Sequence, residues 1–155
     1  MHGIAILTNS ADHHLQGDLA ITILRGFVDE PGSVFAERLD YPHYAVGHNV
    51  TLRKGRYGNA TLSRHPILRE RNIDLTVGFR KRRGCQHTRL LAKSPTGRRH
   101  RLEVFNLHLG LSARERQAQV DMLARSRELR GLRDDVPCVV GGDFNDWRSL
   151  IQPFF

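Results

Sequence analysis

The stretch Pro137–Trp147, PCVVGGDFNDW, decides how the chain is organised. A short apolar run bounded by proline and glycine predicts a buried strand. On an extended backbone, Asp143 and Asn145 point to the same side at the carboxyl end of that strand, where α/β proteins bind their ligands. The stretch therefore predicts either a site of chemistry or an ordinary strand-to-turn junction, because Asp and Asn are also common turn residues.

Two other stretches end in polar residues in a similar way. Arg101–Gly110 (RLEVFNLHLG) is an apolar strand candidate in which Asn106 and His108 repeat the i, i+2 arrangement. Tyr57–Ile67 (YGNATLSRHPI) lies earlier in the chain and is stopped by a proline. Without further information, the histidine and asparagines of these strands are more simply explained as buried hydrogen-bonding residues.

Taken together, the YGNA-LS-R-P, N-x-H-L-G and GDFN blocks resemble the endonuclease/exonuclease/phosphatase superfamily. The blocks occur in the same chain order, and the resemblance runs from about Phe35 to Trp147. It implies a deoxyribonuclease-like fold and a metal-dependent phosphoester hydrolase (a phosphodiesterase or nuclease) using Mg²⁺ or Mn²⁺. It also implies that His108, Asp143 and Asn145 belong to the active site and that Asn59 supports it.

Phosphodiester cleavage needs a water that is aligned and deprotonated, and charge on the phosphoryl oxygens that is stabilised. His108 can donate to a phosphate oxygen or carry a proton near neutral pH. Asp143 can accept a proton from water, and Asn145 offers an uncharged donor beside it. The sequence adds three candidate substrate-binding residues: Arg56, Asn59 and Asn106. Arg64 is a further candidate phosphate contact.

The chain departs from the superfamily at both ends. The early Glu that holds the metal is not recognisable, since the neighbours of Glu30 do not match, and no Asp-His pair follows the GDFN block. Asp12-His13-His14 is either a metal-ligand cluster or, more simply, a polar loop. The metal ligands therefore stay unknown. The expectation is one incomplete domain spanning residues 1–155, weakly active or inactive by itself.

Composition and charge narrow the class of protein. With 155 residues, 39% apolar and 26% charged, the chain has the make-up of a soluble single domain. No apolar run reaches about 20 residues, and the N-terminus lacks a secretory pattern, so a cytoplasmic location is expected. Two cysteines are too few for a disulfide framework, and Cys138 is expected in the core.

The net charge of +8 is unevenly distributed. Residues 1–50 hold two basic and six acidic side chains, whereas residues 51–155 hold 22 and 10. The segment Arg80–Arg101 contains nine Lys/Arg and no acid, which favours a phosphate-containing partner. The alternative function is therefore a non-catalytic basic module that binds nucleic acid or anionic lipid phosphate, and a merely solvated basic surface also fits.

Periodicity predicts an α/β (α+β) fold: a partial two-sheet sandwich of mostly antiparallel strands with one long helix. The helix is expected from Ala113 to about Leu132, after a Ser112–Glu115 capping box, and it links two sheet strands. A shorter helix is expected at Ser33–Leu39. Strands are expected at Ile4–Leu7, Leu19–Val28 (or a helical turn), Tyr41–Val46, Tyr57–Ser63, Asn72–Val77, Gln86–Ala92, Arg98–His108 and in the Pro137–Val140 run.

Overall fold

The computed structural model describes residues 4–8, 19–26, 37, 40–52, 55–94 and 96–145. In chain order these residues form β1 (Ile4–Thr8), β2 (Leu19–Gly26), β3 (His43–Leu52), β4 (Gly55–Ser63), β5 (Ile67–Asp74), β6 (Gly84–Lys93), β7 (Arg99–His108), α2 (Ala113–Ala124), α3 (Arg127–Arg130) and β8 (Cys138–Asp143). The predicted helix at Ser33–Leu39 lies outside the described residues, apart from Glu37.

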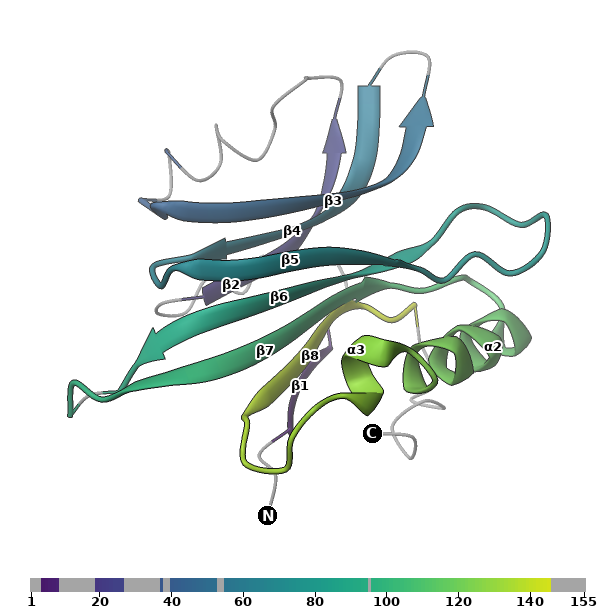
Figure 1. Ribbon diagram of the computed structural model, residues 1–155. Helices are drawn as coiled ribbons and strands as arrows, with labels where there is room; N and C mark the ends of the chain where they lie inside the picture. Colours follow the sequence, from purple (N-terminus) through teal and green to yellow (C-terminus); the bar gives the residue numbers. More distant parts are fainter. Residues whose placement is uncertain are drawn as a thin grey trace.

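The strands form two sheets, as Figure 1 shows. The larger sheet has the order β1-β8-β7-β6-β5, and the smaller has the order β2-β4-β3. β8 runs parallel to both β1 and β7, whereas the other described pairs are antiparallel. The α2–α3 segment connects β7 to β8, as a crossover between parallel strands requires. The predicted α+β, mostly antiparallel two-sheet architecture is confirmed.

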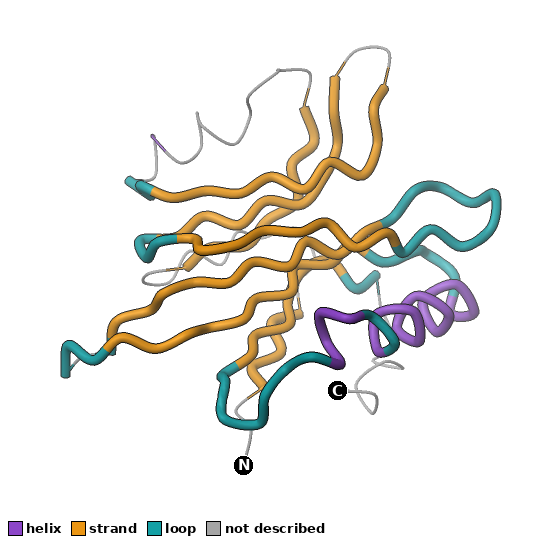
Figure 2. The backbone as a smooth tube through the Cα atoms, in the orientation of Figure 1, coloured by secondary structure: helices purple, strands orange, loops and turns teal. Residues whose placement is uncertain are grey.

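The face of the larger sheet that packs against α2 is apolar. Phe105 and Leu107 alternate along β7 and are fully buried with Val120 and Leu123 of the helix. Figure 2 shows the helices lying along this sheet. Since β-strand side chains alternate between faces, this pattern assigns Phe105 and Leu107 to the hydrophobic core.

A buried ion cluster extends the same face of the sheet. The Glu103 carboxylate accepts from Arg89 Nε at 2.6 Å and lies 2.7 Å from His87 Nε2, and the His87 ring stacks on Phe105 with centroids 4.5 Å apart. Burial alone would raise the pKa of Glu103, but the hydrogen bonds from His87 and Arg89 outweigh it and hold that pKa below its usual value. The cluster thus keeps a buried carboxylate ionised.

The opposite face of the larger sheet meets the smaller sheet through polar contacts. Asn106 donates through Nδ2 to the Ala60 carbonyl at 2.8 Å, and Thr61 Oγ1 donates to Gln86 Oε1 at 2.9 Å. Asn59 donates in the other direction, to the carbonyls of Gly84 and Asn106. These bonds between fully buried groups fix the position of one sheet on the other.

The two cysteines are free and buried, as the strand pattern of Cys138 predicted. Burial raises the pKa of the Cys138 thiol to about 11 and raises that of Cys85 even further. A thiol with a raised pKa is neither a good nucleophile nor a good metal ligand, so both cysteines act as small core residues.

The predicted long helix is wrong in its second half. α2 ends at Ala124, and Ser126 has an extended backbone (φ −63°, ψ 149°) and caps a separate α3 by accepting from the Leu129 amide at 3.2 Å. A serine hydroxyl competes for the backbone in this way, which favours a new helix start over continuation. Ser112 caps α2 as expected, accepting from the Glu115 amide at 3.3 Å.

The strand predicted at Asn72–Val77 begins earlier and ends earlier. β5 starts directly after Pro66, whose carbonyl accepts from the Leu91 amide at 3.0 Å, so the proline opens this strand. It ends at Asp74, whose carboxylate accepts from the Thr76 amide at 2.9 Å and turns the chain. The strands predicted for β1, β2, β4, β6, β7 and β8 are confirmed within a few residues. The strand predicted at Tyr41–Val46 is confirmed as β3, which continues to Leu52.

Candidate active site

The carboxyl ends of β7 and β8 bring a histidine and an aspartate together. The two strands are parallel, and their register places His108 directly beside Asp143. His108 Nε2 lies 3.9 Å from Asp143 Oδ2. This separation is too long for a direct hydrogen bond, but it permits an ion pair or a bridging water or substrate oxygen. The His108 side chain is 3% exposed and that of Asp143 is 26% exposed, so the carboxylate is the group open to solvent.

The Asp143 carboxylate is held by the chain that follows it. The backbone amide of Asn145 donates to Asp143 Oδ1 at 2.9 Å, while Asn145 Nδ2 donates to the Leu109 carbonyl at 2.8 Å. The Leu109 amide in turn donates to the Asp143 carbonyl at 2.9 Å. The ends of β7 and β8 are therefore joined beyond the last ladder position, which fixes the carboxylate relative to His108.

The expected alternation of Asp143 and Asn145 on one extended strand is wrong. β8 ends at Asp143, and Asn145 has φ +49°, in the left-handed region that asparagine tolerates. The two interpretations of this stretch therefore hold together. The Asx-type turn formed by Asp143 and Asn145 is also the structure that orients the Asp143 carboxylate. The active-site role of Asn145 stays a prediction.

The glycine that opens the GDFN block, Gly142, is required by its backbone conformation and by a close contact. Its φ is +126°, and a Cβ at this position would collide with the backbone of Leu107 on β7. Only glycine permits this conformation and this close approach. The sequence requirement thus comes from how tightly β8 closes on β7 just before Asp143.

Asn59 and Asn106 lie between the two sheets, further into the interior than the His108–Asp143 pair. Both are fully buried, and their amides donate to backbone carbonyls on the facing sheet. Asn59 reaches the carbonyl of Gly84, which is paired with His108 in the β6–β7 ladder. This geometry positions the strand that carries His108, and direct binding of substrate by either asparagine stays a prediction.

The two candidate arginines lie at different ends of the sheets. Arg56 is near the start of β4, beyond Asn59 toward the His108 end, and its side chain is outside the described part of the structure. Arg64 follows the other end of β4, where Nη1 lies 3.3 Å from Asp40 Oδ2 and the guanidinium covers the Tyr41 ring. Arg64 is therefore not part of the His108–Asp143 site.

Arg83 is a residue at this end of the sheet that the sequence did not single out. It directly precedes Gly84, is 6% exposed, and its Nε and Nη1 are buried without a hydrogen-bond partner among the described residues. A buried guanidinium is unusual, because an unsatisfied charged donor is costly. Only the pairing of Gly84 with His108 shows that this arginine lies near the site.

The described residues do not form a complete metal site. No group of three or more His, Cys, Asp or Glu side chains that could hold a metal occurs among them. Asp143 supplies one carboxylate, whereas Mg²⁺ needs an octahedral set of oxygen ligands. A divalent ion at this place would need oxygen ligands beyond those that the described residues supply.

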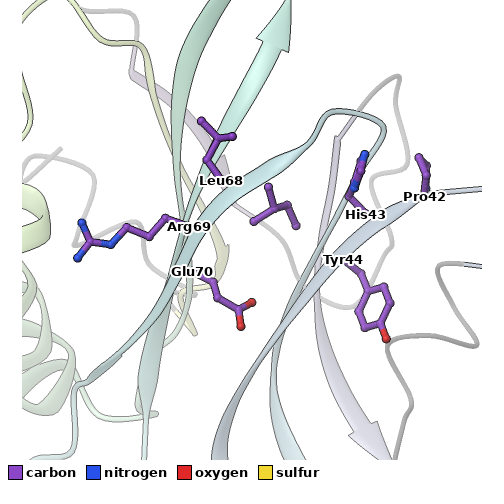
Figure 3. Close-up of a pocket in the computed structure, with 7 residues that line it drawn as sticks. Pro42, His43, Tyr44, Leu68, Arg69 and Glu70 are labelled. Carbon is purple, nitrogen blue, oxygen red and sulfur yellow. The ribbon is translucent and has the colours of Figure 1, made fainter.

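A separate hollow lies away from the site, between the edge strands of the two sheets. It has a volume of about 570 Å³ and is lined by Pro42–Tyr44 on one side and Ile67–Glu70 on the other (Figure 3). Ile67 pairs with Leu90, whereas Asp74 at the far end of β5 pairs with Gly84 beside His108. The hollow is thus at the opposite end of the sheets and takes no part in the His108–Asp143 geometry.

The mostly antiparallel two-sheet α+β sandwich is a deoxyribonuclease-like fold, and His108 and Asp143 lie at the ends of adjacent strands of its larger sheet. The chain belongs to the endonuclease/exonuclease/phosphatase family, whose sequence model matches residues 11–154. Members of this family are generally metal-dependent phosphoester hydrolases.

Curated relatives match most of the chain. The protein YbhP of Escherichia coli K12 is 41% identical over 106 residues, which cover 68% of this chain and 40% of YbhP. YbhP of Shigella flexneri gives the same values. The chain therefore spans less than half the length of the curated relatives that it matches.

Solved structures share the fold at low sequence identity. An endonuclease/exonuclease/phosphatase from Beutenbergia cavernae has a TM-score of 0.62 at 20% identity, covering 83% of this chain and 38% of its own. Truncated TDP2 from Caenorhabditis elegans has a TM-score of 0.54 at 18% identity, with coverages of 81% and 49%. A family protein from Leptotrichia buccalis has a TM-score of 0.56 at 15% identity, with coverages of 92% and 68%.

Proposed function

We propose that the chain hydrolyses phosphoesters, with His108 and Asp143 as the groups that act on the substrate. The observation that carries the proposal is the pairing of these residues at the ends of parallel strands, with 3.9 Å between His108 Nε2 and Asp143 Oδ2. The family membership supports the reaction class.

Each residue has a role that follows from its position. Asp143, held by the Asn145 amide and partly exposed, accepts a proton from the attacking water and orients it. His108, almost completely buried beside it, donates to a phosphate oxygen or passes a proton to the leaving oxygen. Asn145 keeps the carboxylate aligned and offers its side chain as a neutral phosphate contact.

Metal dependence on Mg²⁺ or Mn²⁺ is part of the proposal, because the family is typically dependent on divalent ions. The substrate is a phosphate-containing molecule, with nucleic acid among the candidates, and the expected location is cytoplasmic. None of the helices among the described residues is long and apolar enough to cross a membrane.

The test is hydrolysis of bis(p-nitrophenyl) phosphate with Mg²⁺ or Mn²⁺ by the chain and by His108→Ala and Asp143→Ala. Each substitution is expected to lower kcat by about 10²–10⁴-fold, as for loss of a positioned acid or base. His100→Ala and Asp135→Ala, at exposed positions, are the matched controls. Equal rates for the chain and both site variants would remove the assignment.

A second candidate function is a non-catalytic module that binds phosphate groups through the β6–β7 hairpin. The structure divides the basic Arg80–Arg101 segment, because β6 is ten residues long and separates its two ends by roughly 30 Å. Exposed Arg98, Arg99 and Arg101 gather at the end far from His108. Binding of nucleic acid that is insensitive to salt, or to substitution of these three by Gln, would contradict this function.

A further inference from the structure

Two large apolar side chains are exposed in segments that lead to the His108 end of the larger sheet. Phe79 is fully exposed, at 111% of its reference area, and Leu111 is 70% exposed. Leu111 follows Leu109 and Gly110, the residues directly after His108. Phe79 lies in the loop between β5 and β6, which ends at Gly84, the partner of His108 in the ladder. Large apolar groups that stay in water at one end of a molecule indicate a contact surface.

The structure holds both segments at this end. Figures 1 and 2 show the β5–β6 loop extending on the side of the molecule where α2 begins. Arg80 Nη1 lies 3.3 Å from Glu115 Oε2 in the first turn of α2, so the loop is tied to the helix. Arg116 Nη1 donates to the Leu111 carbonyl at 2.6 Å, which fixes the other segment.

The backbone of the loop presents Phe79 outward. Gly78 has φ +56°, and the Arg80 amide donates to the Val77 carbonyl at 3.2 Å, which closes a tight turn around Phe79. Phe79 occupies the third position of this turn, and its side chain is fully exposed there. Its exposure is therefore built into the loop.

Positive charge lies next to Phe79 in the chain. Arg80, Lys81 and Arg82 directly follow Phe79 and are all exposed. Aromatic and leucine side chains next to lysine and arginine are the combination that binds the interface of an anionic bilayer, where basic residues are attracted to the lipid phosphates. Single-stranded nucleic acid fits less well, because it stacks on successive aromatic rings and Leu111 offers no ring.

We propose that Phe79, Leu111 and the basic residues Arg80–Arg82 form a surface, here called the Phe79 rim, that binds the interface of anionic phospholipid bilayers. Phe79 and Leu111 enter the headgroup region, Lys81 and Arg82 face the lipid phosphates, and Arg80 holds the loop against Glu115 of α2. Resting on the proposed function, the inference makes headgroup phosphoesters the substrate class, since the rim brings the His108–Asp143 site to the bilayer surface.

The test is cosedimentation of the chain with vesicles of phosphatidylcholine alone and of an equal mixture of phosphatidylcholine and phosphatidylglycerol. Binding is expected only with the mixture and is expected to weaken sharply between about 0.1 M and about 1 M salt. Phe79→Ser and Leu111→Ser are each expected to weaken binding about tenfold, from the lost apolar contact. Leu68→Ser, which changes an exposed leucine at the other end of β5, is the control and should bind normally.

Three results would overturn the proposal: equal binding to both vesicle types, unchanged binding by the Phe79→Ser, Leu111→Ser double variant, or binding of a DNA oligonucleotide instead of vesicles with the same dependence on Phe79. Near-unchanged thermal midpoints would show that the variants are folded. Sedimentation measures binding without turnover, so the two proposals can fail separately. Vesicle binding by a chain that does not hydrolyse the diester supports the Phe79 rim and contradicts the proposed enzymatic function. Hydrolysis of a soluble diester without vesicle binding supports the enzymatic function and contradicts the Phe79 rim.

Discussion

The two faces of strand β7 make different kinds of contact. Phe105 and Leu107 point to the face under α2 and are packed in the hydrophobic core. Asn106 and His108 point to the face toward the smaller sheet, where the contacts are hydrogen bonds and the strand ends beside Asp143. Residues adjacent in sequence thus serve stability on one face and positioning or chemistry on the other, and substitutions can separate the two.

The largest effect is expected on catalysis, from a comparison of two buried histidines on opposite faces. His108→Ala should lower kcat by about 10²–10⁴-fold while the chain stays folded. His87→Ala should leave kcat of the folded protein unchanged but lower the free energy of unfolding by about 1–3 kcal/mol, because Glu103 loses a hydrogen-bond donor. Diester hydrolysis measures kcat, and urea denaturation measures the free energy of unfolding. An inactive but fully stable His87→Ala variant would contradict the division of the two faces into a stabilising and a catalytic one.

Phe105→Ala should give the largest loss of stability. The side chain is fully buried and stacks on His87, so its removal leaves a cavity that costs about 3–5 kcal/mol. The free energy of unfolding from urea titration measures the change. Phe79→Ala removes the same ring from a fully exposed position and should change it by less than about 0.5 kcal/mol.

Asn106→Ala should have an intermediate effect that tests the polar face. The substitution removes the donor to the Ala60 carbonyl and leaves that buried acceptor unsatisfied, at a cost of about 1–3 kcal/mol. Urea denaturation checks the value, and kcat should fall as well, since Asn106 precedes His108 on the same face by two residues. A loss as large as that of Phe105→Ala would show that the polar face contributes as much stability as the core.

The smallest effect is expected in acid, from the Glu103 cluster. Because the pKa of Glu103 is lowered in the folded state, its contribution to stability is present above the ordinary value of 4.5 and is lost as the pH falls through the folded pKa. Urea denaturation from pH 7 to pH 3 should show a decline below about pH 4.5 that is shallower in Glu103→Gln. The exposed Glu70→Gln should keep the original pH profile.

Local patterns in the sequence were enough to predict most of the strands and to predict that His108 and Asp143 lie close together. Both residues follow apolar runs in a chain order that resembles a known family, and a helix between such strands implies that they are parallel neighbours. Ser112 as the helix cap follows from chemistry within four residues.

Features that depend on pairing between distant segments could not be predicted in this way. The left-handed Asn145 is stabilised by the Leu109 carbonyl, 36 residues away. The separation of Arg80–Arg82 from Arg98–Arg101 becomes visible only when β6 is known to run the full length between them. The helix break at Ser126 was readable in principle, since serine is a strong cap, but the apolar spacing around it continued.

The reciprocal asparagine bonds, from Asn59 to the Asn106 carbonyl and from Asn106 to the Ala60 carbonyl, have a mechanical consequence. Sliding one sheet along the other by a single residue, about 3.4 Å, would break both bonds at once. It would leave the donors and acceptors buried without hydrogen-bond partners. The two bonds therefore oppose sliding of one sheet along the other. They also keep the end of β7, which carries His108, in a fixed position relative to the smaller sheet.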